Sequence, residues 1–147
     1  VNRIIGPRSL VRFNLYTGTV DSGREPEKAL AQQRFFLAIQ RLPFSVAHFT
    51  RPLKYYASWP QVPPQEKGVD TRIVQDLIMG AVDHTYDVAV LLSGDQDFCE
   101  AVKLLHARFP VELETYYPVS RRHLYETSRS YFTRAEVITK KFYCDIR

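Results

Sequence analysis

The sequence contains no apolar run close to the roughly 20 residues that a membrane-spanning helix needs, and no secretory leader is visible. Its two cysteines, Cys99 and Cys144, form neither a C-x-x-C motif nor a disulfide framework. Free thiols suit a reducing compartment, so we expect a cytoplasmic protein without a membrane partner. Glycine-rich phosphate loops and a Ser-His-Asp or Cys-His arrangement are also missing, which argues against the common nucleotide-binding loops and covalent hydrolases.

The composition is that of an ordinary globular protein. The chain has 147 residues, of which 45% are hydrophobic and 24% charged, enough for one domain with a buried core. The excess of 20 Lys+Arg over 16 Asp+Glu gives a net charge of +4. This mild positive charge is compatible with a polyanionic partner without requiring one.

Strand-like and helical segments alternate along the chain, as in a parallel sheet with crossover helices. The predicted fold class is therefore α/β, with a mostly parallel central sheet flanked by helices. In such sheets the working site lies beyond the carboxyl ends of the strands. The expected strands are 9–16, 44–56, 86–93, 111–117 and 135–143, and the expected helices are 27–42, 69–84, 96–109 and 120–132.

Three aspartates are predicted to lie at this edge of the sheet. Asp95 and Asp97 follow the most hydrophobic strand, in LLSGDQDF (91–98), and Asp70 begins helix 69–84 on its apolar stripe. Taken singly, each suits a helix cap or a first helical turn, where an anion is favoured. Taken together, three carboxylates repel one another unless a cation lies between them. Oxygen ligands of this kind suit Mg²⁺ or Mn²⁺, so the cluster predicts a metal-assisted phosphodiester site.

The segment EKGVDTRIVQDLIMGAVDHTYDVAVLLSGDQDF (66–98) resembles the NYN domain, a PIN-like nuclease fold, and specifically its LabA-like branch. The family's K-G-x-D motif matches Lys67, Gly68 and Asp70, and its S-G-D-x-D-F motif matches the residues from Ser93 to Phe98. The likeness extends more loosely over nearly the whole chain, so we expect one NYN domain over 1–147. It implies a three-layer PIN-like fold and a divalent-metal-dependent ribonuclease that hydrolyses phosphodiester bonds with a metal-activated water.

Roles are carried over by position. Asp70, Asp95 and Asp97 would be the catalytic residues and would hold Mg²⁺ or Mn²⁺. Ser93 would assist through its hydroxyl or simply shape the turn. Lys67 would contact a phosphate, or it is an ordinary solvated loop lysine.

One departure from the family pattern concerns its first strand, usually the middle of the sheet, which carries an Asp in an I-D-x-x-N-L motif. The segment FNLYTG (13–18) is superficially similar, but Val11 and Arg12 stand where the acid and its neighbour should be. Either the first strand lies outside these 147 residues, or this homologue has lost a central acid. We expect the former, because a sheet without its middle strand would leave buried backbone groups unpaired.

A second group of residues suits nucleic acid. Cations and aromatic rings interleave from Arg51 to Trp59, and Arg121 and Arg122 open the last expected helix. Single-stranded RNA needs charge for its backbone and flat surfaces for its bases, so this mixture predicts RNA contacts by Arg51, Lys54, Arg121 and Arg122. The alternative is a solvated edge with core tyrosines.

Three functions are therefore considered. The first is an endoribonuclease acting on single-stranded RNA, and a homo-oligomer is compatible with it. The second is a non-catalytic regulatory or RNA-binding module that keeps the fold, which the missing acid makes credible. The third is a metal-dependent phosphatase or other phosphotransfer enzyme that uses the same edge.

Overall fold

The structure is a computed structural model and describes residues 5–93, 95–116 and 142–146. No helix among these residues has the length and apolar character needed to cross a membrane. The elements follow in the order β1 (Leu10–Thr19), α2 (Pro26–Ile39), β2 (Val46–Pro52), α3 (Val69–Val82), β3 (Val88–Leu92), the short 3-10 helix η1 (Gln96–Phe98), α4 (Cys99–Arg108), β4 (Glu112–Tyr116) and β5 (Phe142–Ile146).

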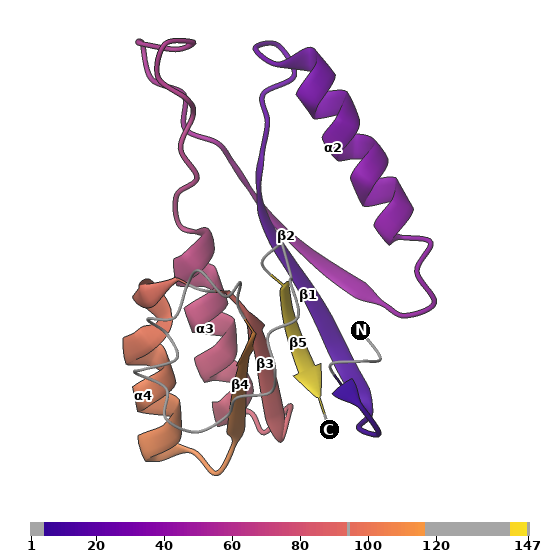
Figure 1. Ribbon diagram of the computed structural model, residues 1–147, viewed down its shortest axis with the longest axis vertical. Coiled ribbons are helices and arrows are strands. Elements are labelled where there is room, and N and C mark those ends of the chain that lie inside the picture. Colours follow the sequence, from indigo (N-terminus) through magenta and orange to yellow (C-terminus); the bar gives the residue numbers. More distant parts are fainter. Residues whose placement is uncertain (1–4, 94, 117–141, 147) are drawn as a thin grey trace.

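The strands form one five-stranded sheet in the order β2-β1-β5-β3-β4. β1 pairs with β2 in parallel, and β3 pairs with β4 in parallel. β5 lies between the two pairs and runs antiparallel to both of its neighbours. Four strands therefore share one direction, which confirms the predicted α/β class with a mostly parallel sheet (Figure 1).

Apolar side chains cover both faces of the sheet. All five residues of β3 are buried, as expected for a continuous apolar strand covered on both sides. On one face, α3 and α4 pack side by side and bury a helical stripe that includes Ile73 and Leu77. On the other face a smaller cluster joins Ile5 of the N-terminal segment to Phe13 and Val90. α2 lies apart from α3 and α4, beside β1 and β2 (Figure 1).

Several element boundaries differ from expectation. The expected helix 96–109 is divided into η1 and α4, and the expected strand 44–56 ends at Pro52, which has no backbone N–H to continue the ladder. β5 begins at Phe142, later than the extended piece expected over 135–143. The expected helix 120–132 lies outside the described residues.

The middle of the sheet is occupied by the C-terminal strand. β5 is paired along both edges, to β1 on one side and to β3 on the other. The described sheet therefore has no empty central position, and the expectation that buried backbone groups would be left unpaired does not apply to it. The register places Phe142 opposite Leu92, at the carboxyl end of β3, and Asp145 opposite Ala89.

Candidate functional site

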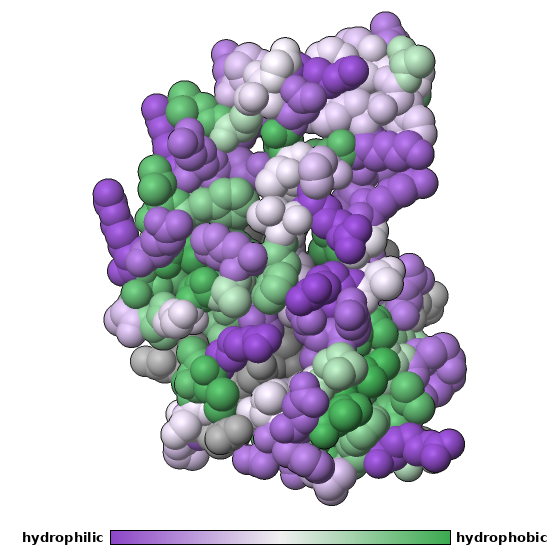
Figure 2. All heavy atoms as spheres, turned by 180° about the vertical axis from the view of Figure 1, so that it is seen from behind, coloured by the Kyte–Doolittle hydropathy of each residue, from purple (hydrophilic) through white to green (hydrophobic). Residues whose placement is uncertain are grey.

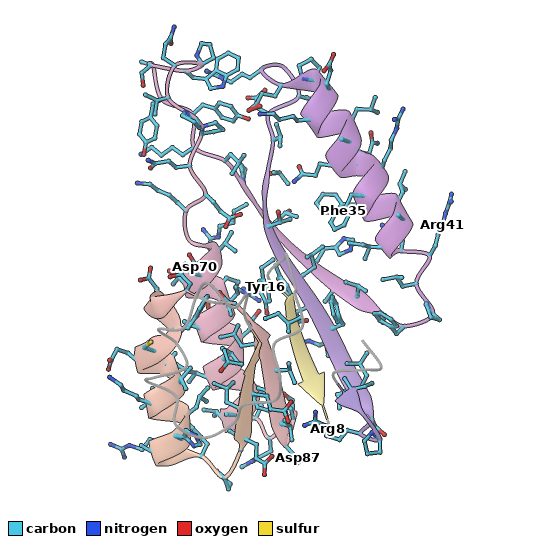
Figure 3. All side chains as sticks on the ribbon, viewed as in Figure 1. Arg8, Tyr16, Phe35, Arg41, Asp70 and Asp87 are labelled. Atoms are coloured by element: carbon cyan, nitrogen blue, oxygen red, sulfur yellow. The ribbon has the colours of Figure 1, made fainter. Side chains whose placement is uncertain are left out.

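The predicted acids belong to one edge of the sheet. Because β1, β2, β3 and β4 are parallel, their carboxyl ends lie on the same side. α3 begins after β2 and η1 begins after β3, and these two helices are in contact. Asp70 lies in the first turn of α3, at the end of that helix labelled in Figure 3, and Asp97 lies in η1.

Asp70 is not the cap of its helix. The N-cap of α3 is Gly68, which has a left-handed backbone with φ 78° and supplies no side-chain hydrogen bond. Asp70 is half-buried beside the core residues Val69 and Ile73, at the end of the apolar stripe. The capping interpretation therefore fails for this residue. Its place in the first turn suits a favourable interaction with the positive end of the helix dipole.

The turn after β3 is held by its own side chains. The buried hydroxyl of Ser93 accepts a hydrogen bond from the Asp95 amide at 3.2 Å. Asp95 Oδ1 in turn accepts a hydrogen bond from the Asp97 amide at 3.3 Å. Ser93 thus shapes the turn, and Asp95 supports the start of η1 as a cap. Asp97 is exposed, and Asp95 is half-buried.

A divalent cation suits these donors by type. Carboxylate oxygens are the ligands that Mg²⁺ and Mn²⁺ prefer, and Mg²⁺ commonly uses only one or two carboxylates, with waters and substrate phosphate completing its coordination. Within the described ranges, however, no three His, Cys, Asp or Glu side chains form a group that could hold a metal ion. The convergence of Asp70, Asp95 and Asp97 on one ion stays a prediction.

Basic residues lie on the β2 side of the same edge. Arg51, near the end of β2, crosses the start of α3, with its Nη1 3.5 Å from the place that a Cβ would occupy on Gly68. Lys54 and Lys67 are exposed, and the Lys54 ammonium lies 5.2 Å from the centre of the Tyr56 ring. Arg121 and Arg122 lie outside the described residues.

Residues 54–65, which we name the aromatic loop, project beyond this edge. The loop closes on itself through two backbone hydrogen bonds between Lys54 and Gln65, at 2.8 and 3.0 Å. Tyr55 and Trp59 meet edge to face at 5.9 Å, and the Arg24 guanidinium lies 5.2 and 5.6 Å from the two ring centres. In Figure 2 the upper end of the molecule is mostly pale and purple, and few of its residues have the green colour that marks apolar residues.

The tyrosines of this loop are not core residues. Tyr55 and Tyr56 are half-buried, and Tyr55 Oη accepts a hydrogen bond from the Asp21 amide and donates one to Glu25. Partial desolvation is the main cause that raises the pKa of Tyr55, and the neighbouring Glu25 adds to it. Sequence reasoning missed Arg24, because it reaches the loop from the β1–α2 connection and not from the aromatic segment itself.

A second arginine was also missed. Arg72 of α3 pairs with Asp76 one turn later, and Asp76 accepts a hydrogen bond from the Tyr16 hydroxyl of β1. The sequence carries no local signal for the contact between Asp76 and Tyr16, because the two residues are 60 positions apart. Figure 3 shows Tyr16 beside α3, below Asp70.

The comparisons with known proteins identify the family. The NYN domain matches residues 1–133, while no curated protein and no solved structure matches the chain. The NYN family generally comprises metal-dependent ribonucleases, which act on RNA and typically use divalent metals. Since the match covers most of the 147 residues, the chain belongs to the NYN domain family.

Proposed function

We propose that this protein is a divalent-metal-dependent ribonuclease that hydrolyses phosphodiester bonds of single-stranded RNA. The observation that carries the proposal is the NYN family match over residues 1–133. In support, Asp70, Asp95 and Asp97 all follow the carboxyl ends of parallel strands, where open α/β sheets carry their ligands. These carboxylates would hold Mg²⁺ or Mn²⁺, and the bound cation would supply a Lewis acid and an activated water.

The finer assignments belong to the same proposal. They are the LabA-like branch, a three-layer arrangement, a single NYN domain over the whole chain, a cytoplasmic location and a homo-oligomer.

RNA contacts are proposed for the β2 side of the edge. Arg51, Lys54 and Lys67 would bind backbone phosphates, and the aromatic loop would stack unpaired bases. Trp59 is the only tryptophan in the sequence, so its fluorescence reports on this loop alone. Single-stranded RNA added in EDTA should quench this fluorescence, whereas a duplex of the same length should do so much less.

Mutagenesis tests the charged contacts. Arg51→Ala and Lys54→Ala should each weaken binding and reduce the salt dependence of the binding constant by about 0.7 for each phosphate that is no longer neutralised. Arg121→Ala with Arg122→Ala should have the same effect if the last expected helix contributes. An unchanged salt dependence in all of these variants would place the binding surface elsewhere.

A non-catalytic RNA-binding module is the second candidate. It is favoured by the antiparallel β5, which fills the centre of the described sheet and places Phe142, not an acid, level with the carboxyl end of β3. Cleavage of a labelled single-stranded RNA with Mn²⁺ distinguishes the two candidates. Metal-dependent cleavage that Asp97→Asn abolishes supports the nuclease. RNA binding without cleavage supports the second candidate.

A further inference from the structure

Arg72 and three other side chains, those of Asp76, Phe49 and Tyr16, form one cluster. The Arg72 Nε lies 3.0 Å from both carboxylate oxygens of Asp76. The guanidinium carbon lies 4.8 Å from the centre of the Phe49 ring, and that ring stacks on Tyr16 at 5.0 Å with an interplanar angle of 15°. The Tyr16 hydroxyl completes the cluster with a hydrogen bond of 2.8 Å to Asp76.

The exposure of the four residues differs in a way that bears on function. Tyr16 is 6% exposed and the Asp76 side chain 12%, whereas the Arg72 side chain is 39% exposed. Within the part of the chain that the structure describes, the hydrogen bond of the Arg72 side chain uses Nε, and its two terminal Nη groups have no protein acceptor. The cluster therefore fixes the plane of the guanidinium and leaves its outer donors facing solvent.

Such an arrangement does more than compensate the Asp76 carboxylate. The pair with Asp76 compensates that nearly buried carboxylate, but pairing alone requires neither a ring on one face of the cation nor terminal donors left in solvent. A guanidinium whose orientation is already fixed loses less conformational freedom when it binds, and its planar fork matches the geometry of a phosphate.

The position of Arg72 relates it to the acidic edge. Arg72 lies over Phe49 of β2, and its partner Asp76 is bonded to Tyr16 of β1, so this flank of α3 faces those two strands. α4 and η1 contact α3 from the side of β3, where Asp95 and Asp97 are found. Asp70 lies in the first turn of the same helix, two residues before Arg72, and Arg51 crosses the start of that helix.

We propose that Arg72 is a phosphate-binding residue for single-stranded RNA, with Asp76, Tyr16 and Phe49 as its positioning residues. The inference rests on the proposed function, since it places the scissile phosphate at the carboxylates and a neighbouring phosphate at Arg72. Asp76 is then not a metal ligand, although it is an acid close to the site.

The test measures binding in EDTA, so that it does not depend on cleavage. A set of 2′-O-methyl oligonucleotides, each with one phosphate replaced by an uncharged methylphosphonate, is bound to the parent protein and to Arg72→Ala. For the parent, neutralising one particular phosphate should weaken binding about tenfold, the order expected for one charge-assisted hydrogen bond. Arg72→Ala should weaken binding of the unmodified strand by a similar factor and should no longer respond at that phosphate, while its responses at other phosphates stay unchanged.

Controls separate a direct phosphate contact from a structural effect. Arg34→Ala removes an exposed arginine of α2 and should leave both affinity and pattern unchanged. Arg72→Lys keeps the charge but removes the fork, and should restore only part of the response. Asp76→Asn weakens the ion pair that orients Arg72, so it should reduce the affinity about threefold through the contact with the same phosphate. The stabilisation of the protein by Mn²⁺ should remain equal to that of the parent.

The opposing outcomes are distinct. The inference would be overturned if Arg72→Ala lowered the affinity but still responded to neutralisation of every phosphate as the parent does, or if it did not lower the affinity at all. A parent protein that fails to bind the strand would also overturn it. Disappearance of Mn²⁺ stabilisation in Asp76→Asn would make that acid a ligand and overturn its positioning role. A parent that binds the strand in EDTA yet never cleaves RNA with Mn²⁺ would remove the nuclease proposal and leave Arg72 as a phosphate-binding residue.

Discussion

Replacing Asp95 by Asn separates its two roles, because the substitution keeps the shape of the side chain and removes its charge. The structural role is the acceptance of the Asp97 amide by Oδ1 at 3.3 Å. Asn caps about as well as Asp, so the free energy of unfolding of the metal-free protein should change by less than about 0.5 kcal/mol. Any relief of repulsion among the neighbouring carboxylates would hold or raise the melting temperature.

The metal-binding role predicts a different result once Mn²⁺ is present. At a Mn²⁺ concentration of about 100 times its dissociation constant, the parent should gain about 2.7 kcal/mol. For a chain of this size that corresponds to a rise in melting temperature of about 5–10 °C. Asp95→Asn should lose most of this rise, and its cleavage of RNA should fall at least about a hundredfold, the scale for removal of an electrostatic catalytic group.

A matched control is Asp87→Asn. Asp87 is an exposed residue that precedes β3, at the opposite end of the sheet from Asp70 (Figure 3). Melting curves with and without Mn²⁺, beside a cleavage assay, are needed for the parent and both variants. Equal Mn²⁺ responses and equal cleavage in all three proteins would reduce Asp95 to a cap and refute the metal assignment.

Three further predictions concern stability. Leu77→Ala removes a side chain that is 0% exposed in the main core and should lower the free energy of unfolding by about 3–5 kcal/mol in urea, whereas Met79→Ala, on the exposed side of the same helix, should cost less than about 1 kcal/mol. Gly68→Ala places a Cβ on a residue with φ 78°, beside Arg51, and should cost about 1–2 kcal/mol by the same measurement, while Gly23→Ala in the exposed β1–α2 connection serves as the comparison. The pKa of Glu25 is lowered chiefly by its hydrogen bond with Lys28, and Tyr55 contributes, so this stabilisation is present above the ordinary value of 4.5 and is lost as the pH falls through the lower folded-state pKa. Glu25→Gln should therefore flatten the acid side of the stability profile, and an unchanged profile would show that the pair contributes nothing in solution.

The parts of the fold that the sequence predicts well are those set by local pattern. β3 is a continuous apolar run, and α3 begins at the expected residue and ends at Val82, two residues before the expected end. The motifs around Asp70 and Asp95 lie at the ends of these two elements, so their common edge follows from the order of strands and helices. Local pattern suffices for these two elements because the buried apolar residues of each one follow its own regular spacing.

Contacts between distant segments could not be predicted in the same way. Tyr16 and Asp76 are joined across 60 residues, and either could have been satisfied by water or by another neighbour. Arg24 reaches Trp59 from a different connection. The central position of β5 depends on which edges of the other strands are free to pair with it. The local pattern of residues 142–146 cannot indicate these partners.

The placement of β5 has a consequence for the order of folding. Its hydrogen bonds join residues as far apart as Leu10 and Ile146, and in the described sheet it is the only strand that pairs with both parallel halves. Each half is built from segments near one another in sequence and can form early, whereas β5 follows both halves along the chain and is synthesised after them. Pairings of such high sequence separation are slow. During synthesis the nascent chain would therefore carry two preformed halves with exposed inner edges, and removal of residues 142–147 should leave that species as an aggregation-prone end product.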